Sequence, residues 1–471
     1  MEIAVIDDGI NVSYFGLKPL KRDLEVDEDL NIISRSNADQ LCNTHGSICA
    51  AIILKHFPEA EITSIKVLDS KTRKGTLPQL LKALEWCLET RIPVINLSIG
   101  STQFQDFSSI RRLITALYRQ GSIIVAAYNN QNIYTVPASL ECVIGVRHNK
   151  ELKVGKYLVS NEFEFLVEVN VPHYFKNIYS HEIEAPASNS YAAPYITALV
   201  CQMLKGGLSA QLCFIWEKLS RKRFSSFSPN FCVMPDIIDE AEVVDLSGNE
   251  NCGLFYFKVN KIYTIANIDE LSLINQLTYI VVIAERESDL LAVRDNLHDI
   301  EAYIRGIFYC FKAENTQYCI KIGERAWYET YYLKKFKKSK QVKIDIPLVY
   351  LKGTKEALIP ILKELEMILT LEDYSVKIVG EFKRAYLYGF EFSKNHKSRL
   401  NVINNVYQHF QPDIIICGIL ENMPSDLITG LPTCCGEEDL YLDLKEFGEG
   451  CNHSRLIYQK ILEKFDVGNP T

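Results

Sequence analysis

Hydrophobic positions over residues 1–205 alternate between short continuous apolar runs and longer amphipathic stretches. The continuous runs are rich in valine and isoleucine, which is typical of strands covered on both faces. The longer stretches have helical spacing, and one of them carries a proline in its first turn, where proline is favoured. Strands that alternate with helices predict an α/β fold, a parallel sheet with helices on both faces. The predicted strands are Ile3–Ile6, Ile62–Val67, Val94–Ile99 and Ser122–Ala127, and the predicted helices are His45–Leu54, Pro78–Thr90 and Ser108–Arg119.

This pattern weakens between residues 218 and 251, and an α/β rhythm then returns. The segment RKRFSSFSPN is basic and then rich in serine, which is typical of a linker. Later strands are predicted at Thr278–Ala284, Ile307–Phe311, Ile346–Leu351, Ser375–Val379 and Asp413–Ile416, with helices at Asp289–Gly306 and Lys355–Leu371. We therefore expect a first domain over residues 1–220, a linker over 221–250, a small α/β domain over 251–343 and another α/β domain over 344–471.

The last of these domains begins with PLVYLKGTK, residues 347–355, which has the strand, turn and helix order of a phosphate-binding loop. It lacks the G-x-x-x-x-G-K-[ST] spacing, so we interpret the domain as resembling a degenerate nucleotide-binding fold. We expect no cofactor, with nucleotide binding as the alternative. The basic stretch LKKFKKSKQVK, residues 333–343, is interpreted as a solvated connection, with a local patch for an anionic partner as the alternative.

The composition of the chain argues against several classes of binding partner. The net charge of −8 is spread along the chain, which argues against a broad surface for nucleic acid or an anionic membrane. Fourteen cysteines are scattered, many of them inside apolar runs, and no pair of C-x-x-C motifs suggests a metal site. The N-terminal MEIAVIDDGI has neither the basic nor the long apolar region of a signal peptide. We expect reduced core thiols, no metal, no nucleic-acid or membrane partner, and a cytoplasmic protein.

Five short motifs place polar residues at the ends of predicted strands or the starts of predicted helices. They are VIDDGI at 5–10, NTHGS at 43–47, VINLSIG at 94–100, VAAYNN at 125–130 and ASNSYAAP at 187–194. Each has an ordinary structural explanation when taken alone. Asp7 precedes a turn glycine, His45 is the neighbour of a helix cap, and Ser190 is a helix-capping serine.

In this order and spacing, the five motifs resemble those of the subtilase family, in which the triad runs Asp, His, Ser along the chain. The resemblance covers about residues 1–205 and implies a subtilisin-like sheet. It also implies that Asp7, His45 and Ser190 form a catalytic triad and that Asn129 donates to the oxyanion. The substrate backbone would pair alongside Ser98, Ile99 and Gly100, with Ala127 and Tyr128 as further substrate-binding residues.

Several positions depart from the usual subtilase pattern. Ser188 and Asn189 stand where the family usually has glycine and threonine, and Tyr191 stands where it often has methionine. Tyr128 replaces a usual glycine before the oxyanion asparagine. None of these changes removes a catalytic group, but they could narrow the cleft or shift the oxyanion geometry.

The resemblance implies a selective intracellular serine endopeptidase acting on a peptide or protein. A more specific expectation comes from the cytosolic subtilases of bacterial peptide-maturation systems: the substrate would be the leader of a ribosomally made precursor peptide, and the C-terminal half would recognise it. The alternative is a catalytically degenerate subtilase that acts as a peptide-binding or regulatory module. Retention of Asp7 and Asn129 argues against that alternative, because a binding module needs neither.

Overall fold

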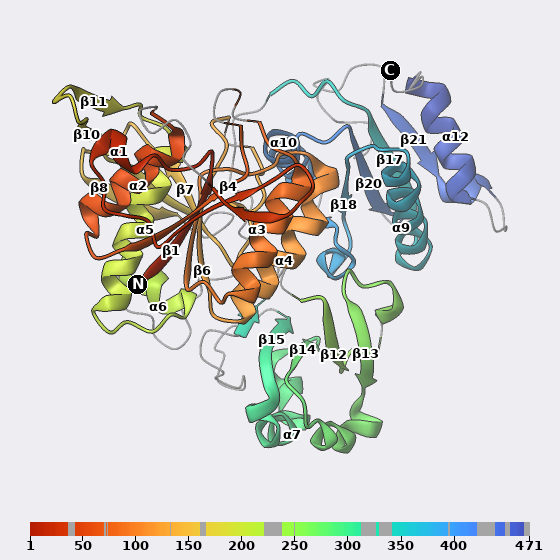
Figure 1. Cartoon of the computed structure of the whole chain (residues 1–471). Helices are drawn as coiled ribbons and strands as arrows, with labels where there is room; N and C mark the ends of the chain where they lie inside the picture. The colour runs from red at the N-terminus through yellow and green to blue at the C-terminus, as the bar shows by residue number, and fades with distance from the viewer. Residues whose placement is uncertain are drawn as a thin grey trace. The chain divides into compact units, whose positions relative to one another are not determined.

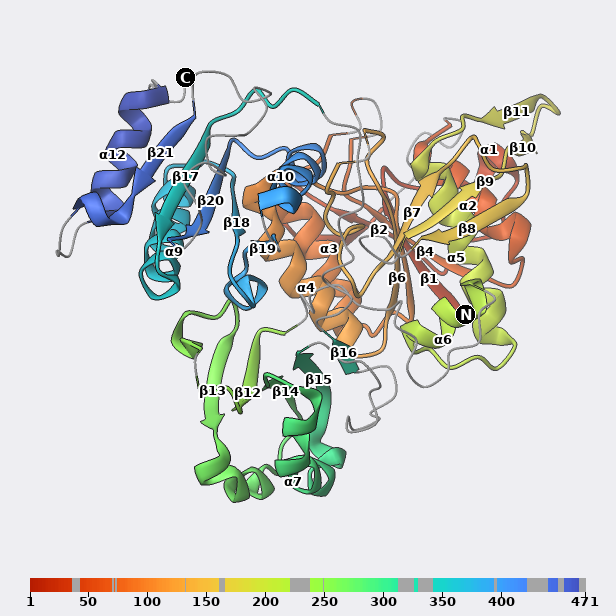
Figure 2. The ribbon, with the colours of Figure 1, turned by 180° about the vertical axis from the view of Figure 1, so that it is seen from behind.

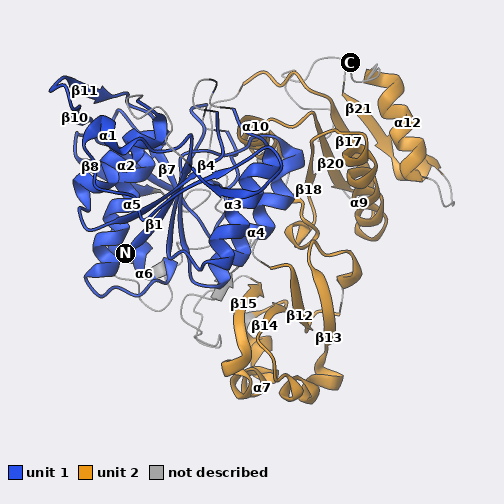
Figure 3. Ribbon diagram, in the orientation of Figure 1, with its two compact units in different colours: residues 1–225 blue, residues 226–471 orange. Residues whose placement is uncertain are grey.

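The computed structural model describes residues 1–35, 43–69, 72, 74–131, 133–160, 166–220, 238–248, 250–311, 326–328, 342–393, 396–421, 439–447 and 453–465. The chain divides into two compact units, residues 1–225 and residues 226–471 (Figure 3). We call them unit 1 and unit 2, and each is described by itself.

Unit 1 is built on a nine-stranded sheet of order β3-β2-β4-β1-β5-β6-β7-β9-β8 (Figure 1). All neighbouring strands are parallel except at the two edges, where β3 and β8 run antiparallel to their partners. The strands are β1 (Glu2–Asp7), β2 (Arg22–Val26), β3 (Ile32–Ser34), β4 (Glu61–Lys66), β5 (Val94–Leu97), β6 (Ile123–Ala127), β7 (Ile144–His148), β8 (Lys156–Ser160) and β9 (Leu166–Asn170). A separate antiparallel hairpin pairs β10 (His173–Lys176) with β11 (Glu182–Ala185).

Helices cover both faces of this sheet, with α2 and α5 on one face and α3 and α4 on the other (Figure 2). The helices of unit 1 are α1 (Val12–Phe15), α2 (His45–His56), α3 (Leu77–Glu89), α4 (Phe107–Arg119), α5 (Asn189–Lys205) and α6 (Leu212–Ser220). In β1, Ile3 and Val5 pack into one core cluster with α2 and α5, and Ala4 and Ile6 are also fully buried. Continuous apolar sequence therefore reflects burial of both faces, and the predicted fold class is confirmed.

Unit 2 contains two all-parallel five-stranded sheets. The first lobe, residues 238–328, has the order β13-β12-β14-β15-β16, and the second lobe, residues 342–465, has the order β19-β18-β20-β17-β21. The first-lobe elements are β12 (Glu240–Asp245), β13 (Lys258–Tyr263), β14 (Thr278–Ile283), β15 (Ile304–Cys310), β16 (Ala326–Tyr328) and α7 (Arg294–Asp299). The second-lobe elements are β17 (Leu348–Gly353), β18 (Val376–Gly380), β19 (Glu391–Phe392), β20 (Ile414–Leu420), β21 (Leu440–Asp443), α9 (Lys355–Leu371), α10 (His396–Phe410) and α12 (His453–Phe465).

Two predictions for the first lobe differ from the structure. Strand β12 lies inside segment 221–250, which is predicted above as a linker. The sequence does not reveal the strand, because its alternating acidic and apolar residues are too few to stand out. One helix is predicted over residues 289–306, but the structure has the shorter helix α7 there, with a short 3-10 helix on each side. Val293 and Ile300 leave the helical conformation, although both side chains are buried. Apolar spacing of three residues is also the 3-10 period, so the sequence pattern fits either structure.

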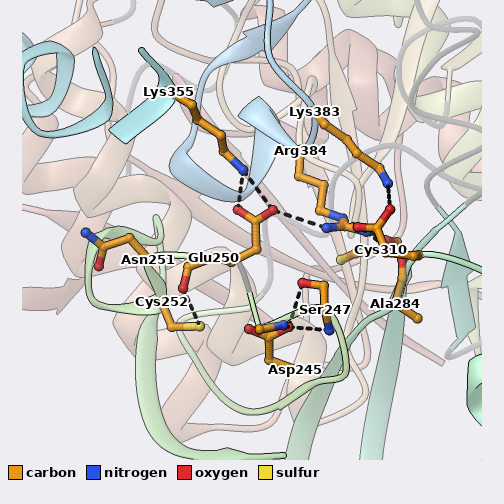
Figure 4. Close-up of polar contacts among 12 residues, drawn as sticks. Asp245, Ser247, Glu250, Asn251, Cys252, Ala284, Cys310, Lys355, Lys383 and Arg384 are labelled. Carbon is orange, nitrogen blue, oxygen red and sulfur yellow. Dashed lines mark hydrogen bonds and ion pairs between the residues drawn. The ribbon is translucent and has the colours of Figure 1, made fainter. Parts of the chain in front are cut away.

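The two lobes of unit 2 contact each other through the buried side chain of Arg384 (Figure 4). Its guanidinium donates to the backbone carbonyls of Ala284 and Cys310, at the ends of β14 and β15. It also donates to the Glu250 carboxylate at 3.1 Å. In chain order, the first sheet runs 2-1-3-4-5, an arrangement that binds ligands at the carboxyl ends of its strands, at the point where the strand order reverses. Arg384 of the second lobe lies at the carboxyl ends of two of these strands, β14 and β15.

The Glu250 carboxylate in turn engages the loop that resembles a phosphate-binding loop. Lys355 Nζ lies 2.9 Å from each Glu250 oxygen, and Tyr388 Oη donates to the same carboxylate at 2.6 Å. A Cβ on Gly353 would lie 2.8 Å from the Leu444 side chain, so packing holds the backbone there. The lysine of this loop is thus paired with a carboxylate of the same chain.

Some predicted features lie outside the described residues. These are the serine-rich segment 221–230 and the basic segment 333–343, apart from residues 342 and 343. The seven cysteines whose side chains the structure describes as free are all buried, as expected for reduced core thiols. In the described parts of the chain, we find no helix with both the length and the apolar character needed to cross a membrane.

Candidate active site

Asp7 is the last residue of β1, at the carboxyl end of a central strand of the sheet. Its side chain is 1% exposed, and both carboxylate oxygens lie 2.9 Å from His45 Nδ1. The backbone N–H of Asp8 donates to Asp7 Oδ1 at 2.9 Å. A buried carboxylate held in this way fixes the orientation of the imidazole and selects the tautomer with its proton on Nδ1.

His45 opens α2, and its position depends on the tight packing of the helix start. Thr44 caps the helix by accepting from the Ser47 N–H, and its own hydroxyl donates to the Gly9 carbonyl at 2.8 Å. A Cβ on Gly46 would lie 2.6 Å from that same carbonyl, so only glycine fits after the histidine.

Asp8 is a second buried carboxylate here, and we did not single it out from the sequence. It accepts from the backbone N–H groups of His45 at 3.0 Å and Gly46 at 2.8 Å. Burial raises the pKa of Asp8, the charge of Asp7 raises it further, and the two N–H donors oppose this rise. Asp8 therefore joins the end of β1 to the start of α2, directly beside the Asp7–His45 pair.

Ser190 is the second residue of α5, after the capping residue Ser188, whose side chain accepts from Tyr191 N–H. Its Oγ lies 3.5 Å from the Ser98 carbonyl oxygen, and within the described residues it makes no hydrogen bond to the His45 ring. The next side chain, Tyr191, stacks on that ring at a centroid distance of 4.8 Å. Hydrogen bonds of catalytic groups are often long in free enzymes and shorten when substrate binds.

Cys49 lies one helical turn after His45 and contacts Asp7, His45 and the Ser190 backbone. Its Sγ lies 3.8 Å from Asp7 Oδ2 and from His45 Nδ1, and 3.9 Å from the Ser190 carbonyl oxygen. The Ser98 hydroxyl donates to that same carbonyl at 2.9 Å. Burial raises the pKa of the Cys49 thiol, so this side chain is neutral at neutral pH.

The pKa of His45 results from opposing effects. Burial lowers it, while Cys49 and the Asp7 carboxylate raise it, and the net direction is upward. Because Cys49 is a neutral thiol, we assign the upward shift to Asp7. The pair thus favours the imidazolium, the form that a general base reaches after it takes a proton.

Asn129 lies just beyond β6, and its side-chain oxygen is held by its own loop. Oδ1 accepts from the N–H groups of Gln131 at 3.1 Å and Ile133 at 3.2 Å. The amide nitrogen is therefore directed away from these groups. Such a half-buried side-chain amide has a donor available for an oxyanion.

The expected substrate-binding residues do not all lie at an accessible surface. Strand β5 ends at Leu97, and beyond it Gly100 is exposed and Ile99 partly so, while the next residue, Ser101, pairs with Val136 in an antiparallel bridge. Ala127 and Tyr128, in contrast, are each only 4% exposed. Their burial argues against side-chain contact with substrate and leaves the backbone after Leu97 as the better candidate.

Asp7, His45 and Cys49 also form the one group in the described residues whose oxygen, nitrogen and sulfur donors could hold a metal ion together. These are ligands that suit Zn²⁺. The same Asp7 and His45 atoms form the pair described above, so metal binding and pairing would exclude each other.

Comparisons with known proteins concern mainly the first half of the chain. The family model described as "Subtilase family" matches residues 1–263. Minor extracellular protease Epr of Bacillus subtilis (strain 168) is 29% identical over 163 residues, which is 32% of this chain and 24% of that protein. Subtilisin DY of Bacillus licheniformis is 26% identical over 161 residues, 31% of this chain and 55% of that protein. The chain thus matches only about a quarter to a half of these relatives' length.

Among solved structures, a cold-adapted subtilisin-like serine proteinase is 19% identical and has a TM-score of 0.37, covering 47% of this chain and 81% of its own. The epidermin leader peptide processing serine protease of Staphylococcus aureus is 17% identical with a TM-score of 0.39, covering 48% and 70%. TM-scores this low support no argument about substrate. The family model, however, matches more than half of the 471 residues, and we conclude that this chain belongs to the subtilase family.

Proposed function

We propose that this chain is a serine endopeptidase in which Ser190 is the nucleophile, His45 the general base and Asp7 the carboxylate that orients it. The observation that carries the proposal is the convergence of three groups from distant parts of the sequence. The Asp7–His45 pair is buried at one strand end. The backbone of Ser190 lies beside it: the ring of the next residue, Tyr191, stacks on His45, and Cys49 Sγ contacts the Ser190 carbonyl oxygen.

In the proposed reaction, Ser190 Oγ attacks the scissile carbonyl while His45 Nε2 takes the hydroxyl proton. The carbonyl oxygen becomes an oxyanion, to which Asn129 Nδ2 and the Ser190 backbone N–H would donate. The first N–H groups of a helix have no partner within it, which leaves the Ser190 N–H available. His45 then protonates the leaving amine, and water hydrolyses the acyl-enzyme by the same route.

A fluorophosphonate probe tests the proposal, because it phosphonylates only an activated serine. We expect the full chain to be labelled and Ser190→Ala to remain unlabelled. Ser122→Ala is the matched control: this buried serine lies before β6, at the opposite end of the sheet from Asp7, donates to the Ile92 carbonyl oxygen, and its loss should leave labelling intact. No labelling of the wild-type chain would instead support the rival proposal, a degenerate subtilase that binds peptides without cutting them.

The substrate is a finer proposal. We propose cleavage of a selected peptide, such as the leader of a ribosomally made precursor, inside the cell. The buried free cysteines are consistent with a reducing compartment. Precursor peptides encoded beside the gene for this chain should be cut once, as measured by mass spectrometry, while casein stays intact. General digestion of casein would contradict this selectivity.

We also propose that unit 2 recognises the substrate. The division at residue 225 suggests the comparison of residues 1–225 with the full chain. We expect the fragment to cleave a short reporter peptide but to lose kcat/KM on a long precursor. If the fragment matches the full chain on both substrates, unit 2 has no such role.

A further inference from the structure

We propose that Asn189 is a positioning residue that sets the distance between the two oxyanion donors, Asn129 Nδ2 and the Ser190 N–H. This inference rests on the proposed endopeptidase function. Asn189 directly precedes Ser190 and opens α5. Its side chain is buried, with the residue only 5% exposed, and it points into the protein rather than toward a substrate. It stands where subtilases usually have threonine, whose side chain has no amide N–H donor.

Both ends of the Asn189 carboxamide are used. Nδ2 donates to the Asn129 carbonyl oxygen at 2.7 Å and to the Tyr128 carbonyl oxygen at 3.2 Å. Oδ1 accepts from the His148 backbone N–H at 2.7 Å. One side chain thus ties the start of α5 to the ends of β6 and β7. An amide has two N–H donors and an acceptor oxygen, which is the set these three contacts require.

These contacts lie between the two proposed donors. The Asn129 backbone receives a hydrogen bond from Asn189, while its side-chain oxygen is held by Gln131 and Ile133. On the other side, one peptide bond joins Asn189 to the Ser190 N–H. A shift of the Asn189 side chain would therefore change the distance between the donor at Asn129 and the donor at Ser190.

A residue that only fills space would not need these donors. Asn189→Asp separates the two explanations because it keeps the size and the acceptor for His148. It replaces the two N–H donors with a carboxylate oxygen that faces two carbonyl oxygens. We expect kcat to fall by about 10²-fold, the loss typical of a small misplacement of reacting groups, with KM nearly unchanged. The rate per active site is measured after titration of active sites, so misfolded protein does not contribute.

Asn177→Asp serves as the matched control. Asn177 is also buried in unit 1, and its Oδ1 accepts from the N–H groups of Tyr179 and His181 in the β10–β11 turn. Its kcat should remain that of the wild type. If Asn189→Asp does not fold, Asn189→Thr tests the same loss with the residue that is usual in the family, and we expect the same direction.

A double-mutant cycle with Asn129→Ala gives the decisive comparison, because it shows whether Asn189 acts through Asn129. The kcat loss caused by Asn189→Asp should be several-fold smaller when the Asn129 side chain is absent, since only the Ser190 N–H is then left to position. An unchanged kcat in both Asn189 variants, or an equal loss in both backgrounds, would overturn the inference alone. A wild-type chain that turns over no peptide would overturn the proposed function and this inference with it.

Discussion

At the residue scale, the Asp7–His45 pair determines which protonation state the site favours. Asp7→Asn should shift the acid limb of kcat/KM to lower pH, and this follows from the sign of the pKa shift. His45 must be neutral to act as a base, and a raised pKa means that it gains its proton at a higher pH. Without the Asp7 carboxylate, burial lowers that pKa against one negative charge fewer, since only Asp8 remains beside the ring.

The same variant should lose about 10⁴-fold in kcat, as the corresponding change does in a serine protease with this triad. A pH profile of kcat/KM measures the shift of the acid limb, and kcat at saturating substrate measures the loss of rate. Asp23→Asn, which removes a carboxylate paired with Arg35 rather than with a histidine, is the control. An acid limb that stays in place would show that Asp7 does not act on His45.

Two residues of this site could not be identified from motifs alone. Asp8 follows Asp7 directly, and a sequence pattern does not show which of two adjacent carboxylates faces the histidine. Cys49 stands four residues after His45, the spacing that places two side chains on one helical face. Only the packing of α2 against β1 shows that this face is the one under the imidazole.

At the element scale, Asp8, which follows β1, caps the start of α2 by accepting from its first backbone N–H groups. Asp8→Ala should cost about 0.5–2 kcal/mol of unfolding free energy, the usual cost of losing a helix cap. It should also lower kcat, because the lost contacts hold His45 and Gly46 themselves. Chemical denaturation and steady-state kinetics measure the two effects.

Thr76→Ala is the matched control, since Thr76 caps α3 in a capping box away from the Asp7–His45 pair. It should lose similar stability without any change in kcat per active site. Equal kcat values in Asp8→Ala and Thr76→Ala would contradict a positional role for Asp8.

Sequence patterns predicted the helices and strands best where the apolar residues follow one regular period. Helix α9 was predicted at its observed bounds, and the central strands of unit 1 within two residues at either end, because both show long uninterrupted periodicity. The prediction was wrong over residues 289–306, where the buried Leu290, Val293, Leu297 and Ile300 are spaced by three, four and three residues. This pattern is that of one α-helix, although its three-residue steps also fit 3-10 turns. Propensity and spacing cannot separate these structures without the contacts of the whole lobe.

At the scale of the whole molecule, the ion pair of Arg384 and Glu250 joins the lobes of unit 2. Arg384→Leu should lower the unfolding free energy by about 3–5 kcal/mol, because it leaves part of the charge of buried Glu250 uncompensated. Lys355 still pairs with Glu250, so we expect the lower end of this range. Urea unfolding of the full chain, followed by hydrogen exchange in β14 and β15, measures the loss.

The exposed ion pair of Lys261 and Glu270, in the same first lobe, provides the control. Lys261→Ala should leave the exchange rates of both strands unchanged. Rates in Arg384→Leu equal to those of the wild type would show that the arginine does not hold the lobes together. No sequence pattern could have predicted this pair, because more than a hundred residues separate its members and each lies in an unremarkable loop.

The place of Arg384 at the carboxyl ends of β14 and β15 also bears on how a ligand could bind there. An arginine tethered to the same polypeptide acts at an effective concentration in the millimolar range, whatever the dilution of the protein. A ligand that bound at these strand ends would therefore have to displace a side chain of the same polypeptide.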